Sequence, residues 1–131
     1  MPSDHQGETT MKLLSPKVHG VIDYVSVILL AVSPSLFGLA GVAALVAYAL
    51  AVIHLSMTVL TDFPLGMVRL VPLRLHGLVE IVVGVALVSL PWLLTRAVAL
   101  GDRGRIFYTA FGAVLIAVFV ATDYAGGARR A

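Results

Sequence analysis

The sequence predicts an all-α integral membrane protein, a polytopic four-helix bundle made of two helix hairpins that repeat in parallel. Hydrophobic residues make up 60% of the chain and charged residues only 12%, about half the charged share of a soluble domain. Residues 24–61 contain no Asp, Glu, Lys or Arg, and one bilayer crossing takes about 20 helical residues. This stretch fits two spans, and the apolar blocks 75–94 and 106–122 fit two more. Too few polar residues remain to coat a soluble bundle.

Proline and glycine mark the ends of the predicted spans in the first hairpin. Ser15 is a suitable N-cap, and Pro16 stands at the first helical position, where its missing N–H costs nothing. We expect a helix over residues 18–32 that ends at the Ser-Pro-Ser sequence 33–35. After a glycine-containing turn, the second helix should cover residues 42–61.

The second hairpin follows the same plan. Residues 63–71 form a connection, and Pro72 opens a third helix that should run to Pro91 and Trp92, where Trp92 suits the membrane interface. A loop over residues 95–105 then leads to a fourth helix over 106–123. Stripes of small residues should pack helices two and four. These stripes are Ala47 and Ala51 with Thr58 and Thr61, and Ala113, Ala117 and Ala121.

The chain divides into three parts by composition. Residues 1–14 are polar and expected to be disordered, residues 15–124 form the transmembrane domain, and residues 125–131 form a basic tail. Within the domain, repeat one covers 15–63 and repeat two covers 72–124.

Lysine and arginine predict the orientation, because they concentrate on the cytoplasmic side. Six lie on the side of the termini and the central connection: Lys12, Lys17, Arg69, Arg74, Arg129 and Arg130. Three lie on the other side: Arg96, Arg103 and Arg105. We expect a multi-pass protein of the cell membrane, a bacterial inner membrane, with both termini cytoplasmic.

An internal repeat relates the two halves. Residues 17–23 (KVHGVID) align with 74–80 (RLHGLVE), and the same offset places Pro34 on Pro91. Further on, residues 61–63 (TDF) pair with 122–124 (TDY). Hairpins with an even number of spans insert in the same orientation, so an axis along the membrane normal should relate them.

These motifs resemble the SPW-repeat integral membrane proteins of bacteria. The resemblance rests on the His-Gly-x-x-Asp-Tyr sequence at 19–24, its second copy at 76–80, and a proline motif at the far end of the odd helices. Here residues 33–35 lack the tryptophan, residues 89–92 have an inserted leucine, and Ile81 replaces the aromatic residue of the second copy. The resemblance implies a two-repeat, four-helix architecture and no particular activity.

Two acids inside the spans are candidate site residues, since ionisable groups at such depth usually face the bundle interior. Asp23 and Glu80 each follow a histidine by four residues, so His19–Asp23 and His76–Glu80 share helix faces and can pair. The pairs are either two structural contacts near the headgroups or one shared polar site. His54, without a counterpart in repeat two, should point inward as a hydrogen-bonding residue.

Asp62 and Asp123 end helices two and four, where the helix dipole disfavours an anion. We therefore expect structural ion pairs with Lys17 and Arg74, with Arg69 as a third candidate.

The composition excludes several classes of function but does not identify one. The absence of cysteine excludes disulfides and thiolate metal sites. No basic stripe with interleaved aromatic residues indicates nucleic acid. The expected partner is the lipid bilayer, with a homo-oligomer or a partner subunit left open. We expect a non-enzymatic protein whose polar cluster binds a small ligand, ion or partner, without a cofactor. The alternative is a haem- or metal-binding, or proton-transporting, subunit that uses His19, His76, Asp23 and Glu80.

Overall fold

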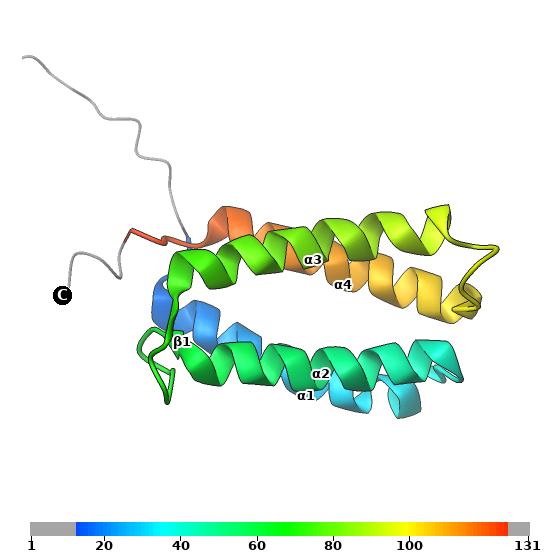
Figure 1. Ribbon diagram of the computed structural model, residues 1–131, viewed down its shortest axis with the longest axis horizontal. Helices are drawn as coiled ribbons and strands as arrows, with labels where there is room; N and C mark the ends of the chain where they lie inside the picture. The colour runs from blue at the N-terminus through cyan, green and yellow to red at the C-terminus, as the bar shows by residue number, and fades with distance from the viewer. Residues whose placement is uncertain (1–12, 126–131) are drawn as a thin grey trace, which may run out of the picture.

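The computed structural model describes residues 13–125 and consists of four long helices (Figure 1). They are α1 (Pro16–Phe37), α2 (Val42–Leu60), α3 (Leu73–Leu93) and α4 (Gly101–Ala121). All four are long and apolar enough to cross a membrane. The predicted four-helix membrane bundle is therefore confirmed. The expectations for residues 1–12 and 126–131 lie outside the described residues.

The helices form two hairpins, α1 with α2 and α3 with α4, and each helix packs most closely on its hairpin partner. Figure 1 shows the hairpins side by side, with both hairpin turns at one end of the bundle. The described chain ends and the α2–α3 connection lie at the other end. There β1 (Thr61–Asp62) pairs in parallel with β2 (Val71–Pro72), and Leu14 forms a parallel bridge with Thr122.

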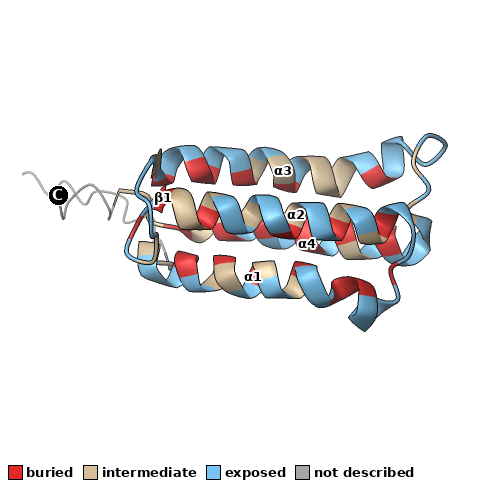
Figure 2. Cartoon of the chain, turned by 60° about the horizontal axis from the view of Figure 1, so that its bottom comes forward, coloured by how far each residue is buried: buried red, intermediate tan, exposed pale blue. Residues whose placement is uncertain are grey.

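Large apolar side chains are exposed on the outward helix faces, and the buried residues lie on the faces turned toward the other helices (Figure 2). On α1 the exposed positions follow helical spacing: Val18, Val21, Val25, Ile28 and Val32. Four of the seven buried positions of α1 are polar, namely His19, Asp23, Ser26 and Ser33; the other three are Gly20, Leu30 and Pro34. A water-soluble helix shows the opposite arrangement. This pattern suits a helix whose outer surface contacts lipid.

Apolar side chains fill the bundle away from the chain ends. One cluster in the middle consists of Leu30, Ala51, Phe111 and Leu115, and a second nearer the hairpin turns consists of Leu39, Ala43, Ala47 and Tyr108. The predicted small-residue stripe of α2 is buried, but Ala113 and Ala117 of α4 are exposed. The stripe prediction for α4 is therefore wrong. Gly84 and Gly112 allow α3 and α4 to approach on a different face.

Helix α1 continues through Pro34 to Phe37, beyond its predicted end. Proline has no N–H to donate to the carbonyl four residues earlier, which is Leu30. The hydroxyl of Ser33 donates to that carbonyl instead, at 2.9 Å. Because the buried carbonyl is satisfied, the helix gains one further turn and ends at Gly38, whose φ is 65°. Helix α3 likewise contains Pro91 and ends at Leu93.

Helix α4 begins at Gly101, five residues before the predicted start. Its first turn carries Asp102, which lies at the positive end of the helix dipole and accepts a hydrogen bond from Arg105. The Arg105 guanidinium also lies 5.7 Å from the centre of the Trp92 ring. Of the charges expected in a loop, Asp102, Arg103 and Arg105 therefore belong to the start of α4, whereas Arg96 lies in the turn before it.

Candidate functional site

The five predicted site residues come together in one cluster between the hairpins. Hairpin one contributes His19 and Asp23 from α1 and His54 from α2, and hairpin two contributes His76 and Glu80 from α3. His19, Asp23, His76 and Glu80 are buried, with exposed fractions between 0% and 4%. The His19–Asp23 pair and the His76–Glu80 pair thus form one shared polar site, the second of the two arrangements considered from the sequence.

Two of the four ion-pair contacts within this cluster cross between the hairpins. His19 Nε2 lies 3.3 Å from Asp23 Oδ2 and 3.3 Å from Glu80 Oε2. His76 Nε2 lies 3.3 Å from the same Asp23 oxygen, and His54 Nε2 lies 3.5 Å from Asp23 Oδ1. The predicted His19–Asp23 contact is present. The predicted His76–Glu80 contact is not among these pairs, because hairpin packing places each group closer to a partner on the opposite hairpin.

Two threonines hold the central histidines by their other ring nitrogen. His19 Nδ1 lies 2.8 Å from Thr122 Oγ1, and His76 Nδ1 lies 2.7 Å from Thr61 Oγ1. Each threonine hydroxyl donates its only hydrogen to the backbone carbonyl of the residue four positions earlier. The threonine oxygen must therefore accept from the ring, which places the proton on Nδ1. In the neutral rings, the Nε2 lone pairs consequently point into the cluster.

Sequence reasoning missed the role of these threonines, although the repeated Thr-Asp-aromatic sequence contained them. Two matching backbone contacts hold them, since Thr61 pairs with Val71 and Thr122 with Leu14. The aromatic residues that follow also match.

Each of these aromatic rings covers the glycine next to a central histidine. The ring of Phe63 occupies the space that a Cβ on Gly20 would need, and a Cβ on Gly77 would lie 2.6 Å from the ring of Tyr124. The His-Gly pairs of the motif therefore let the rings close the cluster toward the chain ends. Burial raises the pKa of Tyr124, and the nearby Glu80 carboxylate raises it further, so this hydroxyl stays neutral.

The unsatisfied polar atoms of the bundle gather at this cluster. Among the described residues, six buried side-chain atoms lack a hydrogen-bond partner. Five belong to the cluster: His19 Nε2, Asp23 Oδ1, Asp23 Oδ2, His54 Nε2 and Glu80 Oε2. The sixth is the hydroxyl of Tyr124. A charged side chain in the membrane centre costs about 2.5–3.5 kcal/mol on the insertion scale. Converging acceptors without a donor therefore require a cation or protons among them.

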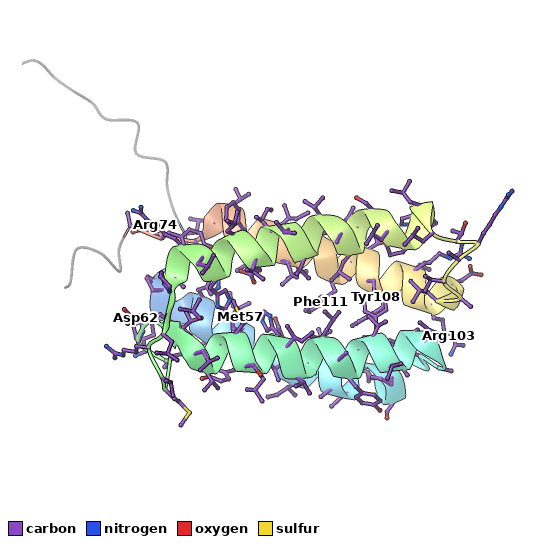
Figure 3. The ribbon with its side chains drawn as sticks, in the orientation of Figure 1. Met57, Asp62, Arg74, Arg103, Tyr108 and Phe111 are labelled. Atoms are coloured by element: carbon purple, nitrogen blue, oxygen red, sulfur yellow. The ribbon has the colours of Figure 1, made fainter. Side chains whose placement is uncertain are left out.

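The predicted ion pairs lie at the same end of the bundle, outside the cluster. Asp62 pairs with Arg69 at 3.9 Å between Oδ1 and Nε, and both side chains are exposed. Lys17 and Arg74 make no ion pair within residues 13–125, although Figure 3 places Arg74 at the same end as Asp62. Asp123 Oδ1 accepts from the backbone N–H of Ala125 at 3.1 Å. Of the predicted clamp, only the Arg69 pair therefore forms among these residues, and its exposure makes it weak.

The space beside the cluster is too small for a haem. A cavity of about 40 Å³ lies against His54, His76 and Glu80. Ligand pockets typically measure roughly 300 Å³ or more. The haem alternative therefore does not fit this packing, whereas a single ion between the side chains does.

No family model, no curated protein and no solved structure matches this chain. The relation to SPW-repeat proteins accordingly stays a prediction, and the cluster has to be interpreted from its own geometry.

Proposed function

We propose that this membrane protein binds one divalent transition-metal ion between its hairpins. The ligands are His19, Asp23, His76 and Glu80. One ligand atom from each of these four residues lies within 4.8 Å of every other. The observation that carries the proposal is the convergence of buried lone pairs that have no donor among them.

The separations suit an ion of this size. Zinc lies about 2.0–2.1 Å from histidine nitrogen and carboxylate oxygen, so tetrahedral ligands stand roughly 3.3–3.4 Å apart. Three ligand separations in the cluster are 3.3 Å. Small adjustments of the remaining side chains then complete the coordination.

The net charge of the four ligands and the tautomer of the two histidine rings also favour a divalent ion. Two carboxylates and two neutral imidazoles carry a charge of −2, which a divalent cation neutralises inside the membrane. The threonines fix Nδ1 as the protonated nitrogen and leave Nε2 for the metal. Such outer contacts are typical of metal-binding histidines. Imidazole and carboxylate without thiolate favour zinc, iron(II) or a neighbouring first-row ion.

The residues that fill the bundle interior are better explained by metal binding than by transport of protons or ions across the membrane. The cluster lies near one end of the bundle, and the middle and far end are filled by the two apolar core clusters described above. A transport route needs polar groups or water along its length. The other buried polar side chains of α1 toward the far end are Ser26 and Ser33, and the Ser33 hydroxyl is bonded to Leu30.

The proposal also includes the predictions from the sequence about membrane location, the absence of catalysis and the internal repeat. We place the protein in a bacterial inner membrane with both termini cytoplasmic. It acts by binding rather than catalysis, and its hairpins derive from one duplicated unit of the SPW-repeat kind. The matching histidine–threonine and glycine–aromatic contacts of the two hairpins support the duplication.

Metal analysis and Co²⁺ titration of the purified protein test the proposal. The intact protein should bind one ion per chain. Asp23→Asn should weaken binding by at least about tenfold, since Asp23 contacts three imidazoles. Asp62→Asn is the matched control, because that carboxylate is exposed at the bundle end. Circular dichroism verifies that each variant is folded. A folded wild-type protein that binds no ion, or equal effects of the two variants, contradicts the proposal.

A further inference from the structure

We infer that the bound ion keeps one coordination position open to the cavity between α2 and α3, where a small lone-pair donor binds and is held by His54. This inference rests on the proposed metal site. It assigns that site a second ligand, of two or three non-hydrogen atoms, which the protein itself does not supply.

His54 differs from the other two histidines of the cluster. It is not among the four residues whose ligand atoms lie within 4.8 Å of one another. Its Nε2 is 3.5 Å from Asp23 Oδ1, whereas the other imidazoles approach Oδ2. Within residues 13–125, no threonine hydroxyl holds its Nδ1 as Thr61 holds that of His76. Its ring is therefore free to adapt to a neighbour other than the metal.

The cavity lies where such a neighbour would sit. It measures about 40 Å³, and its wall includes both His54 and the metal ligands His76 and Glu80. The remainder of the wall is apolar and includes Met57, Val83 and Leu115. Met57 and Phe111 belong to this wall, and Figure 3 shows both between the two hairpins. A ligand in the cavity therefore faces the ion on one side and hydrocarbon on the other.

Size and chemistry define the ligand class. A water-sized probe occupies roughly 10–15 Å³, so the cavity holds about three such volumes. An ion held by these four protein ligands must expand to five-coordinate to take an exogenous molecule, as zinc sites can do, and the cavity beside His76 and Glu80 leaves room for that fifth ligand. Unpartnered His54 Nε2 supplies the additional polar contact that orients the molecule. The ligand is thus a small molecule or anion of the size of azide, and not a lipid or a cofactor.

Azide binding to the Co²⁺-loaded protein tests the inference. Azide should change the visible Co²⁺ spectrum of the wild-type protein in a saturable manner. His54→Leu, which introduces the residue found at the equivalent position 115, should weaken Co²⁺ binding far less than His76→Leu does. It should weaken azide binding by about tenfold, because the orienting contact is lost.

A matched pair of variants tests the cavity itself. Val83→Ile adds one methylene to the cavity wall and should weaken azide binding while Co²⁺ remains bound. Val82→Ile makes the same change on the exposed face and should bind azide like the wild type.

The outcomes separate this inference from the proposed function. If the wild-type protein binds no Co²⁺, the metal site itself is wrong. If Co²⁺ binds but azide leaves its spectrum unchanged, the site is closed and only the inference fails. If His54→Leu loses Co²⁺ as severely as His76→Leu, His54 is a metal ligand and the inference is likewise overturned.

Discussion

At the residue scale, the cluster depends on side chains that each satisfy one requirement of a buried imidazole. A neutral ring needs an acceptor for its N–H and a partner for its lone pair. Thr61 and Thr122 meet the first requirement for His76 and His19. Both hydroxyls are already committed as donors to backbone carbonyls, so neither can rotate to donate to the ring. Two ordinary helix-end residues thus determine which histidine nitrogen faces the acids.

Removing these hydroxyls should weaken metal binding. Thr61→Val and Thr122→Val keep the side-chain shape but leave Nδ1–H without its acceptor. We expect each to lower metal affinity by roughly 10–100-fold, the usual effect of losing an outer contact of a ligand. Competition with a metal-sensitive dye measures this loss. Thr58→Val is the control, since its buried hydroxyl bonds only the carbonyl of His54. An equal loss in the control would falsify the orienting role.

The glycine beside each central histidine makes a second residue-scale prediction. Gly20→Ala places a methyl group where the ring of Phe63 lies, so the ring or α1 must shift. We expect the variant to lose about 1–3 kcal/mol of unfolding free energy, as in other overpacked sites. Unfolding in detergent by added denaturant measures the change. The loss should shrink in a Phe63→Leu background; an undiminished loss there would mean that the ring is not the cause.

At the element scale, α1 shows how a membrane helix accommodates proline. Lipid offers no hydrogen bonds, so a carbonyl freed by proline needs a partner within the protein. The preceding serine supplies it from the same turn. The Ser-Pro sequence is therefore compatible with a continuing helix.

Ser33→Ala should accordingly destabilise α1. It leaves the Leu30 carbonyl unsatisfied in the buried helix, and we expect a loss of about 1–3 kcal/mol in unfolding free energy. In a Pro34→Ala background the residue at 34 regains a backbone N–H, so the same serine change should have little effect. Ser35→Ala is the control because Ser35 is exposed. A double-mutant cycle without coupling between positions 33 and 34 would contradict this explanation.

At the scale of the whole molecule, the site exists only where the hairpins meet. Helices α1 and α3 carry the four proposed ligands, and each hairpin supplies the threonine that holds the other hairpin's histidine. Neither hairpin alone therefore contains an oriented site. The histidine–threonine and glycine–aromatic contacts match in pairs, with Tyr124 in place of Phe63. His54 and the His19–Asp23 contact have no counterpart in the described residues of hairpin two. Rotation of one hairpin onto the other about the membrane normal stays a prediction.

Membrane orientation is the prediction that belongs to this scale. The structure indicates suitable labels: Ala40 and Thr95 are exposed near the two hairpin turns, and Met67 is 78% exposed in the α2–α3 connection. Single cysteines there have no background, since the chain contains none. An impermeant thiol reagent applied to intact cells should label positions 40 and 95 and leave 67 unlabelled. Labelling of position 67 alone would mean that the orientation is opposite to the predicted one. Labelling of all three positions would contradict the four-span topology.

The number of spans, the hairpin order and the candidate residues of the site could all be predicted from the sequence. These follow from local properties: span length, helix-breaking residues, and the i, i+4 spacing of His19 and Asp23. The sequence-based prediction misplaced the end of α1 and the start of α4, because a side-chain hydrogen bond and a charged first turn extend the helices beyond the apolar segments.

The contacts that connect the site residues depend on the packing of the two hairpins. This packing places Glu80 against His19, Asp23 among three histidines, and the two threonines across the hairpin interface. No sequence spacing encodes these partners, because they join helices that are far apart in the chain. Their distances depend on how closely the hairpins pack, and the two apolar core clusters, which join residues of both hairpins, contribute to that packing.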